Sequence, residues 1–298
     1  MEFLRIGEKG HETPVVHAGD KHYDISSIGD IDGKFWAEGP ARVAAALEAG
    51  SLPVIDVAGQ RIGAPIAAAG SVICIGQNYA EHAAESGDNP PESPIIFFKT
   101  PNTVTGPYDA VGIPPQAQKF DWEVELCVVI GKQVEYLTNT DDALDAIAGY
   151  MVANDLSERD YQQTYSGGQW AKGKCVKDSM PVGPVLVTAD AIDPHNLNLS
   201  SRVNGEARQG SNTSDMIFPV EEIVYHLSQF MQLEPGDIIS TGTPKGVALS
   251  GKFPYLAPGD VSEVEVEGLG AQKQEYFQVT VPAGAGAVTA MDRLKGDK

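Results

Sequence analysis

Short runs of apolar, β-branched and aromatic residues, bounded by Gly, Pro or Asp, recur along most of the chain and predict strands. The N-terminal runs cover residues 3–6, 14–16 and 22–25. The later runs cover residues 71–76, 94–99, 123–130, 150–154, 182–187 and 237–241. These strands outnumber the predicted helices and do not alternate with them as βαβ units would. The pattern therefore predicts a strand-rich α+β fold and disfavours a doubly wound dinucleotide-binding fold.

Two of the predicted helices have a clear apolar stripe. In the first, Pro40 is expected in the first turn and Gly50 at the end, with a stripe formed by Val43, Ala44 and Leu47. The second is expected to begin at Pro219, because apolar residues then recur at helical spacing: Ile223, Val224, Leu227, Phe230 and Met231. Both stripes predict helices that pack one face against a core.

The composition of the chain shifts after Pro65, where a run that reads as a buried strand begins at Ser71. We place a domain boundary between residues 64 and 70. The prediction is a small α+β domain over residues 1–68, followed by a second, strand-rich domain over residues 69–298.

Charge narrows the range of partners. The 298 residues include 41 acidic and 21 basic side chains, which gives a formal net charge of −20. Such a surface repels phosphate backbones and anionic lipid, so we expect no nucleic-acid or membrane partner. A bound cation inverts the local field, so a small anionic ligand remains compatible with this charge.

The cysteines and the N-terminus predict a cytoplasmic protein. Cys74, Cys127 and Cys175 are scattered and form no CxxC pair, as expected of reduced thiols. The first residues lack a basic start followed by an apolar core, so no signal peptide is predicted. The longest mostly apolar run, residues 64–76, is too short to cross a bilayer.

Two glutamates begin the predicted strand over residues 123–130. The period of two places Glu123 and Glu125 on one face and Val124 and Leu126 on the other. Two adjacent carboxylates at the edge of a core are costly unless a cation or partner neutralises them. The alternative is a half-exposed strand with a solvated acidic face.

A third carboxylate favours a metal site. Asp155 follows the predicted buried strand over residues 150–154. Together with Glu123 and Glu125 it would supply hard oxygen ligands, which suit Mg²⁺, Mn²⁺ or Ca²⁺. Zinc is disfavoured, because no cysteine or clustered histidine accompanies these residues.

A candidate general base lies earlier in the chain. His82 and Glu85 share one face of a predicted helical turn, so the carboxylate could orient the imidazole and raise its basicity. The alternative is a surface His/Glu pair on a short helix. The polar residues 88–94 that follow read as a loop suited to a lid.

Five motifs occur in an order that closely resembles the fumarylacetoacetate hydrolase family, over about residues 70 to 282. They are Gly76-x-Asn-Tyr-x-x-His82-x-x-Glu85, Glu123-x-Glu125-Leu, Asp155-x-x-x-Arg159-Asp160-x-Gln162, Gly173-Lys174, and Gly236-Asp-Ile-Ile-x-Thr-Gly-Thr-Pro-Lys-Gly-Val247. The resemblance implies a β-rich, roll-like C-terminal catalytic domain, a homodimer, one divalent metal and substrates that are 2-oxo acids with a second carbonyl or enol.

The resemblance also implies roles for individual residues. Glu123, Glu125 and Asp155 match the metal ligands, and His82 and Glu85 match a dyad on a lid. Lys174 matches a lysine beside the metal, and three positions match the substrate pocket: Arg159, Gln162 and Thr243. The chain departs from the family after its lysine, where Cys-Val-Lys177 replaces a small residue, Phe and Asp.

These roles favour a metal-dependent hydrolase that cleaves the C3–C4 bond of a 2,4-dioxo acid, either an acylpyruvate or a 2,4-diketo-3-deoxy sugar acid, to pyruvate and a carboxylic acid. On the same scaffold an oxaloacetate decarboxylase or a 2-hydroxydienedioate isomerase or hydratase needs only small changes. A non-catalytic binding protein is disfavoured, because the dyad and all three ligands are present.

Overall fold

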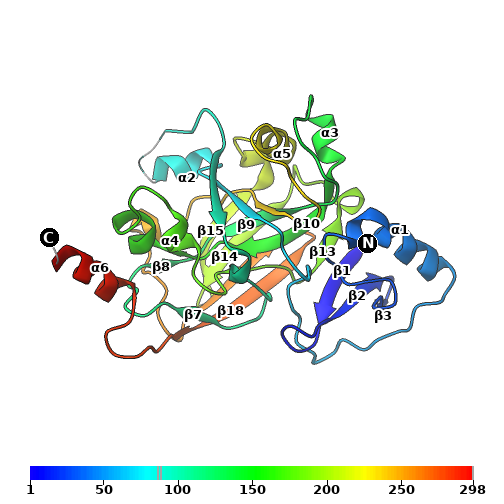
Figure 1. Cartoon of the computed structure of the whole chain (residues 1–298), viewed down its shortest axis with the longest axis horizontal. Coiled ribbons are helices and arrows are strands. Elements are labelled where there is room, and N and C mark those ends of the chain that lie inside the picture. The colour runs from blue at the N-terminus through cyan, green and yellow to red at the C-terminus, as the bar shows by residue number, and fades with distance from the viewer. Residues whose placement is uncertain (86, 88, 297–298) are drawn as a thin grey trace.

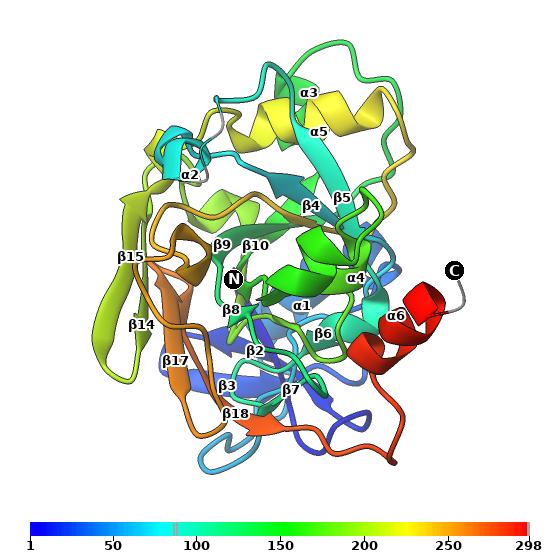
Figure 2. The ribbon, with the colours of Figure 1, turned by 90° about the vertical axis from the view of Figure 1, so that its left-hand side faces the viewer.

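The computed structural model describes residues 1–85, 87 and 89–296. Two β-sheets pack together, with helices at their edges and faces (Figures 1 and 2). The predicted strand-rich α+β class is confirmed.

The predicted lid loop begins at residue 88, which lies outside the described residues. Within the described part of the chain, no helix has the length and apolar character needed to cross a membrane.

The larger sheet has nine strands. β16 and β4 run parallel to each other, and every other neighbouring pair is antiparallel. In spatial order the strands are β3 (Lys21–Asp24), β2 (Thr13–Ala18), β1 (Glu2–Ile6), β13 (Leu186–Thr188), β10 (Ile147–Asn154), β9 (Val124–Ile130), β16 (Ile238–Ser240), β4 (Val72–Gly76) and β5 (Ile95–Lys99).

The smaller sheet has five strands: β15 (Glu206–Asn212), β14 (Asn198–Val203), β17 (Val261–Val266), β18 (Gly270–Gln278) and β7 (Val111–Ile113). Two short pairs complete the strands: β8 (Phe120–Asp121) with β11 (Ser157–Glu158), and β6 (Val104–Thr105) with β12 (Met180–Pro181). The helices are α1 (Phe35–Glu48), α2 (Ala80–Glu85), α3 (Asp141–Leu144), α4 (Ala171–Lys174), α5 (Val220–Ser228) and α6 (Ala287–Gly296), with a π-helix, η2, over Asp160–Thr164.

β9 is buried on both faces. Val124, Leu126 and Val128 join one core with β14, β17 and α5, while Cys127 and Val129 join a second core that includes Phe3 and other N-terminal residues. The half-exposed strand considered from the sequence is therefore wrong, because a second layer covers the face that carries Glu125. β1 to β3 extend the same sheet through β13. The division of the chain at residues 64–70 stays a prediction.

α1 begins at Phe35, so Pro40 lies inside the helix and not in its first turn. The rings of Phe35 and Trp36 pack against Phe3 with centroid distances of 5.3 and 6.0 Å, and this burial favours an earlier start. Asp32 accepts hydrogen bonds from the first amides of the helix. Ala44, expected on the apolar stripe, is exposed.

α5 confirms most of the second predicted stripe. Ile223, Val224 and Leu227 are buried, but the helix ends at Ser228, and Phe230 beyond it is 68% exposed. The expectation for Phe230 was wrong, because the chain leaves the helical path before that position. α5 lies beside α3 in both views (Figures 1 and 2).

Candidate active site and metal centre

Antiparallel pairing of β9 with β10 brings the three predicted ligands together. Glu123 comes just before β9 and Asp155 just after β10, so the start of one strand lies beside the end of the other. The Asp155 N–H donates to the Glu123 carbonyl over 2.9 Å. Carboxylate oxygens of Glu123, Glu125 and Asp155 lie within 4.8 Å of one another, and all three residues are buried.

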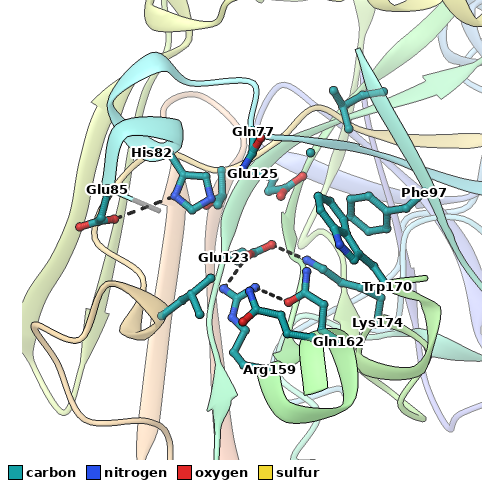
Figure 3. Close-up of a pocket in the computed structure, with 15 residues that line it drawn as sticks. Gln77, His82, Glu85, Phe97, Glu123, Glu125, Arg159, Gln162, Trp170 and Lys174 are labelled. Carbon is teal, nitrogen blue, oxygen red and sulfur yellow. Dashed lines mark hydrogen bonds and ion pairs between the residues drawn. The ribbon is translucent and has the colours of Figure 1, made fainter. Parts of the chain in front are cut away.

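Buried cations surround these carboxylates. Lys174 Nζ, at the end of α4, is 2.6 Å from Glu123 Oε2 and 2.7 Å from Asp155 Oδ2. Lys99 Nζ, at the end of β5, is 2.7 Å from Asp155 Oδ1. Arg159 Nη2 donates to Glu123 Oε1 over 2.7 Å. Figure 3 shows Glu123 between the Arg159 and Lys174 side chains.

The two glutamates differ in proton affinity although they share a strand. Burial opposes ionisation of Glu123, but the Lys174 ammonium and the Arg159 guanidinium outweigh it and lower its pKa to about 2. Burial, reinforced by the charges of Asp155 and Glu123, raises the pKa of Glu125 well above its usual value. Glu125 Oε2 instead accepts from the Ser240 hydroxyl and the Gly242 N–H.

The residues fit a hard divalent cation. Glu123, Glu125 and Asp155 each offer a carboxylate oxygen, and these oxygens lie within 4.8 Å of one another as a set of hard ligands that suits such a cation. Burial is the largest cause of the raised pKa of Glu125, and the repulsion by Asp155 and Glu123 that adds to it is what a cation would relieve. Lys174, Arg159 and Lys99 neutralise part of the negative charge, so a bound divalent ion would leave the site able to accept an anion.

The three predicted substrate-binding residues lie at the same cavity, and each is partly engaged. Arg159 donates from Nε to Asp121 and from Nη1 to Gln162 Oε1. Because its Oε1 already accepts from Arg159, Gln162 can offer a ligand the hydrogens of its side-chain amide. The Thr243 hydroxyl donates to the Val124 carbonyl over 2.8 Å and accepts from Gln209 over 2.8 Å. Thr243 can therefore offer a ligand only its remaining acceptor lone pair.

His82 and Glu85 lie on α2 at the rim of the same cavity. His82 Nδ1 is buried, forms no hydrogen bond and lies 3.9 Å from Glu85 Oε2. In Figure 3 the Glu85 carboxylate lies on the far side of the His82 ring from Glu123. Burial alone would raise the pKa of Glu85, but nearby His82, the Gly246 N–H and Lys252 lower it to about 2. Glu85 is thus a fixed anion beside the His82 imidazole.

The cavity has a volume of about 390 Å³ and is lined by every predicted site residue except Asp155, whose buried carboxylate lies beside those of Glu123 and Glu125. Its wall includes residues that the sequence analysis missed, among them Phe97, Trp170 and Leu249. The sequence analysis also missed Lys99 and Asp121, although both are buried charged residues in direct contact with predicted site residues. A charged residue at the end of an apolar run is the signal that could have identified Lys99.

Comparison with known proteins fits this geometry. The family profile described as the C-terminal domain of fumarylacetoacetate (FAA) hydrolase matches residues 71–276. The chain belongs to the fumarylacetoacetate hydrolase family. Membership confirms the resemblance seen in the five motifs.

Relatives within this family have different reactions in their names. The chain is 47% identical over 221 residues to the mitochondrial oxaloacetate tautomerase FAHD2A of Bos taurus, covering 74% of this chain and 70% of the relative. It is 40% identical over 283 residues to a 2,4-didehydro-3-deoxy-L-rhamnonate hydrolase of a Sphingomonas species, covering 93% and 96%. A crystal structure of maleylpyruvate hydrolase from Sphingobium, with manganese(II) and pyruvate, superposes with a TM-score of 0.77 at 27% identity, covering 94% of this chain and 100% of that chain.

Proposed function

We propose that the protein is a divalent-metal-dependent hydrolase that cleaves the C3–C4 bond of a 2,4-dioxo acid to give pyruvate and a carboxylic acid. The observation that carries the proposal is the placement of a buried imidazole and two members of a carboxylate triad on the wall of one cavity. The triad is Glu123, Glu125 and Asp155, and the imidazole is His82. Such an imidazole can act as the general base that activates a hydrolytic water.

Glu123, Glu125 and Asp155 would hold the cation, for which Mg²⁺, Mn²⁺ and Ca²⁺ are the candidates. When bound, such a cation would supply Lewis acidity toward the oxygens of a 2-oxo acid. A related maleylpyruvate hydrolase has been crystallised with manganese(II) and pyruvate, which supports a divalent metal and a 2-oxo acid as ligands of this site.

The side chains of this chain would divide the remaining work. His82 would take a proton from the water whose oxygen attacks C4, and the fixed charge of Glu85 would stabilise the resulting imidazolium. When the C3–C4 bond breaks, its electron pair stays on C3 as an enolate, and the Lys174 ammonium lies close enough to the triad to stabilise that charge. Protonation at C3 then gives pyruvate.

A second candidate is a reaction of oxaloacetate, because the bovine relative is named as an oxaloacetate tautomerase. Decarboxylation or tautomerisation of oxaloacetate would use the same triad and Lys174 but needs no water at C4. Isomerisation of a 2-hydroxydienedioate would need only proton transfer by His82 and Glu85, whereas its hydration would also add a water molecule to the diene. We also propose, from the family resemblance, that the protein acts as a homodimer, and from its scattered cysteines that it is cytoplasmic.

The test is release of pyruvate from an acylpyruvate, measured with Mg²⁺ and after its removal with a chelator. The proposal expects turnover that disappears with the chelator and returns with added Mg²⁺. Oxaloacetate, followed both by release of pyruvate and by its keto–enol conversion, and a 2,4-dioxo-3-deoxy sugar acid, assayed in parallel, separate the candidates. If oxaloacetate alone reacts, the second candidate replaces the first.

A further inference from the structure

The loop over residues 242–252 follows β16 and contacts three separate parts of the site. Its Gly242 N–H donates to Glu125 over 2.9 Å, and its Ala248 N–H donates to Asp121, the partner of Arg159, over 2.8 Å. Its Gly246 N–H donates to Glu85 Oε2 over 2.8 Å. The loop therefore links the dyad on α2 to the carboxylates of the metal centre.

Lys252 completes the attachment of Glu85 to this loop. Its Nζ lies 3.1 Å from Glu85 Oε1, so both oxygens of the carboxylate have partners on the loop. The Glu85 side chain is only 5% exposed, whereas that of Lys252 is 64% exposed. Because Glu85 Oε2 is 3.9 Å from His82 Nδ1, the loop and not the imidazole fixes the carboxylate in this arrangement.

The point of attachment is rigid. Gly246 has a φ of +107°, and a Cβ built there would lie 2.3 Å from the carbonyl oxygen of Arg208 on β15. Only glycine fits this close approach, so the direction of its N–H toward Glu85 is determined by the backbone. The mobile part of the attachment is therefore the Lys252 side chain.

We infer that Lys252 is a positioning residue, which holds Glu85 and with it α2 so that His82 faces the cavity. Lys252 does not touch the substrate space, and its effect passes through Glu85. The inference rests on the proposed function only in so far as turnover is one readout, because the position of α2 can be measured without turnover.

A matched control lies on the same two elements. Lys245 Nζ is 2.7 Å from Glu81 Oε2, so it too links the loop to α2. The Lys245 and Glu81 side chains are 48% and 69% exposed, and neither belongs to the dyad. Lys245→Met therefore removes a comparable link without touching Glu85.

The experiment compares Lys252→Met, Lys252→Arg and Lys245→Met in the Mg²⁺-loaded protein. Amide hydrogen exchange of α2 and steady-state kinetics on an acylpyruvate are measured for each. For Lys252→Met we expect exchange in α2 to rise about three- to fivefold, as for loss of one partly exposed ion pair. We expect kcat to fall by about threefold or more with KM little changed, since the base and not the binding groups is displaced.

Lys252→Arg should restore both readouts to within about twofold of wild type, because its guanidinium also pairs with a carboxylate. Lys245→Met should leave kcat within about twofold. Equal effects of Lys252→Met and Lys245→Met, or unchanged exchange of α2 in Lys252→Met, would overturn the inference. Absence of any acylpyruvate turnover in wild type would refute the proposed function alone, and the exchange result would still decide the role of Lys252.

Discussion

At the scale of single residues, the surroundings of each carboxylate decide its charge. Glu123 lies between two cations and has a pKa of about 2, whereas Glu125 has hydroxyl and amide donors and a raised pKa. These surroundings also decide how much each glutamate depends on a bound cation. Glu123 is already balanced by protein charges, and Glu125 is the ligand whose charge most needs an added cation.

Glu125→Gln should therefore abolish most Mg²⁺ binding. The amide keeps the shape of the side chain and an acceptor for the Gly242 N–H, but it removes the charge. Calorimetric titration should show Mg²⁺ affinity weakened by about 100-fold or more, while the free energy of unfolding of the metal-free protein changes by less than about 1 kcal/mol. Glu265→Gln, on the exposed side of β17, is the control. Wild-type affinity in Glu125→Gln would remove Glu125 from the ligand set.

At the scale of elements, burial and not periodicity decides which residues of a helix support the fold. Ile223 is fully buried against the larger sheet, while Phe230, placed on the same stripe by its spacing, is exposed beyond the end of α5. Apolar residues at helical spacing continue to Phe230 in the sequence, so spacing alone predicts a longer helix than the structure contains. The real helix ends where the chain turns toward β16.

Ile223→Ala and Phe230→Ala should thus differ in stability. Loss of a buried isoleucine leaves a cavity and should lower the free energy of unfolding by about 2–4 kcal/mol. Removal of the exposed ring should change it by no more than about 0.5 kcal/mol. Urea unfolding monitored by circular dichroism measures both. A large loss in Phe230→Ala would show that this ring is covered in solution.

At the scale of the whole molecule, local patterns predicted the strands and the triad, because β9 and β10 are apolar and the three ligands lie in or next to their adjoining ends. Helix ends were less predictable: α1 starts early because Phe35 and Trp36 pack on β1. Lys99 and Lys252 could not be found from spacing. Their contacts arise only when β5 and the loop after β16 fold against Asp155 and α2.

The overall charge also has a consequence at this scale. A protein with a net charge of −20 repels anions over most of its surface, so a site that binds an anion needs cationic side chains close to it. Lys99, Arg159 and Lys174 are buried beside the triad, in contact with its carboxylates. This arrangement is consistent with a small anionic substrate for a strongly acidic protein.

The central claim is that His82 activates water in a hydrolysis, and the most direct test compares His82→Ala with wild type on two substrates at saturating Mg²⁺. We predict that kcat/KM for an acylpyruvate falls on the order of 10²- to 10⁴-fold, as for loss of a general base. Decarboxylation of oxaloacetate, which needs no activated water, should fall far less. Equal losses on the two substrates, or a wild-type preference for oxaloacetate, would contradict the claim.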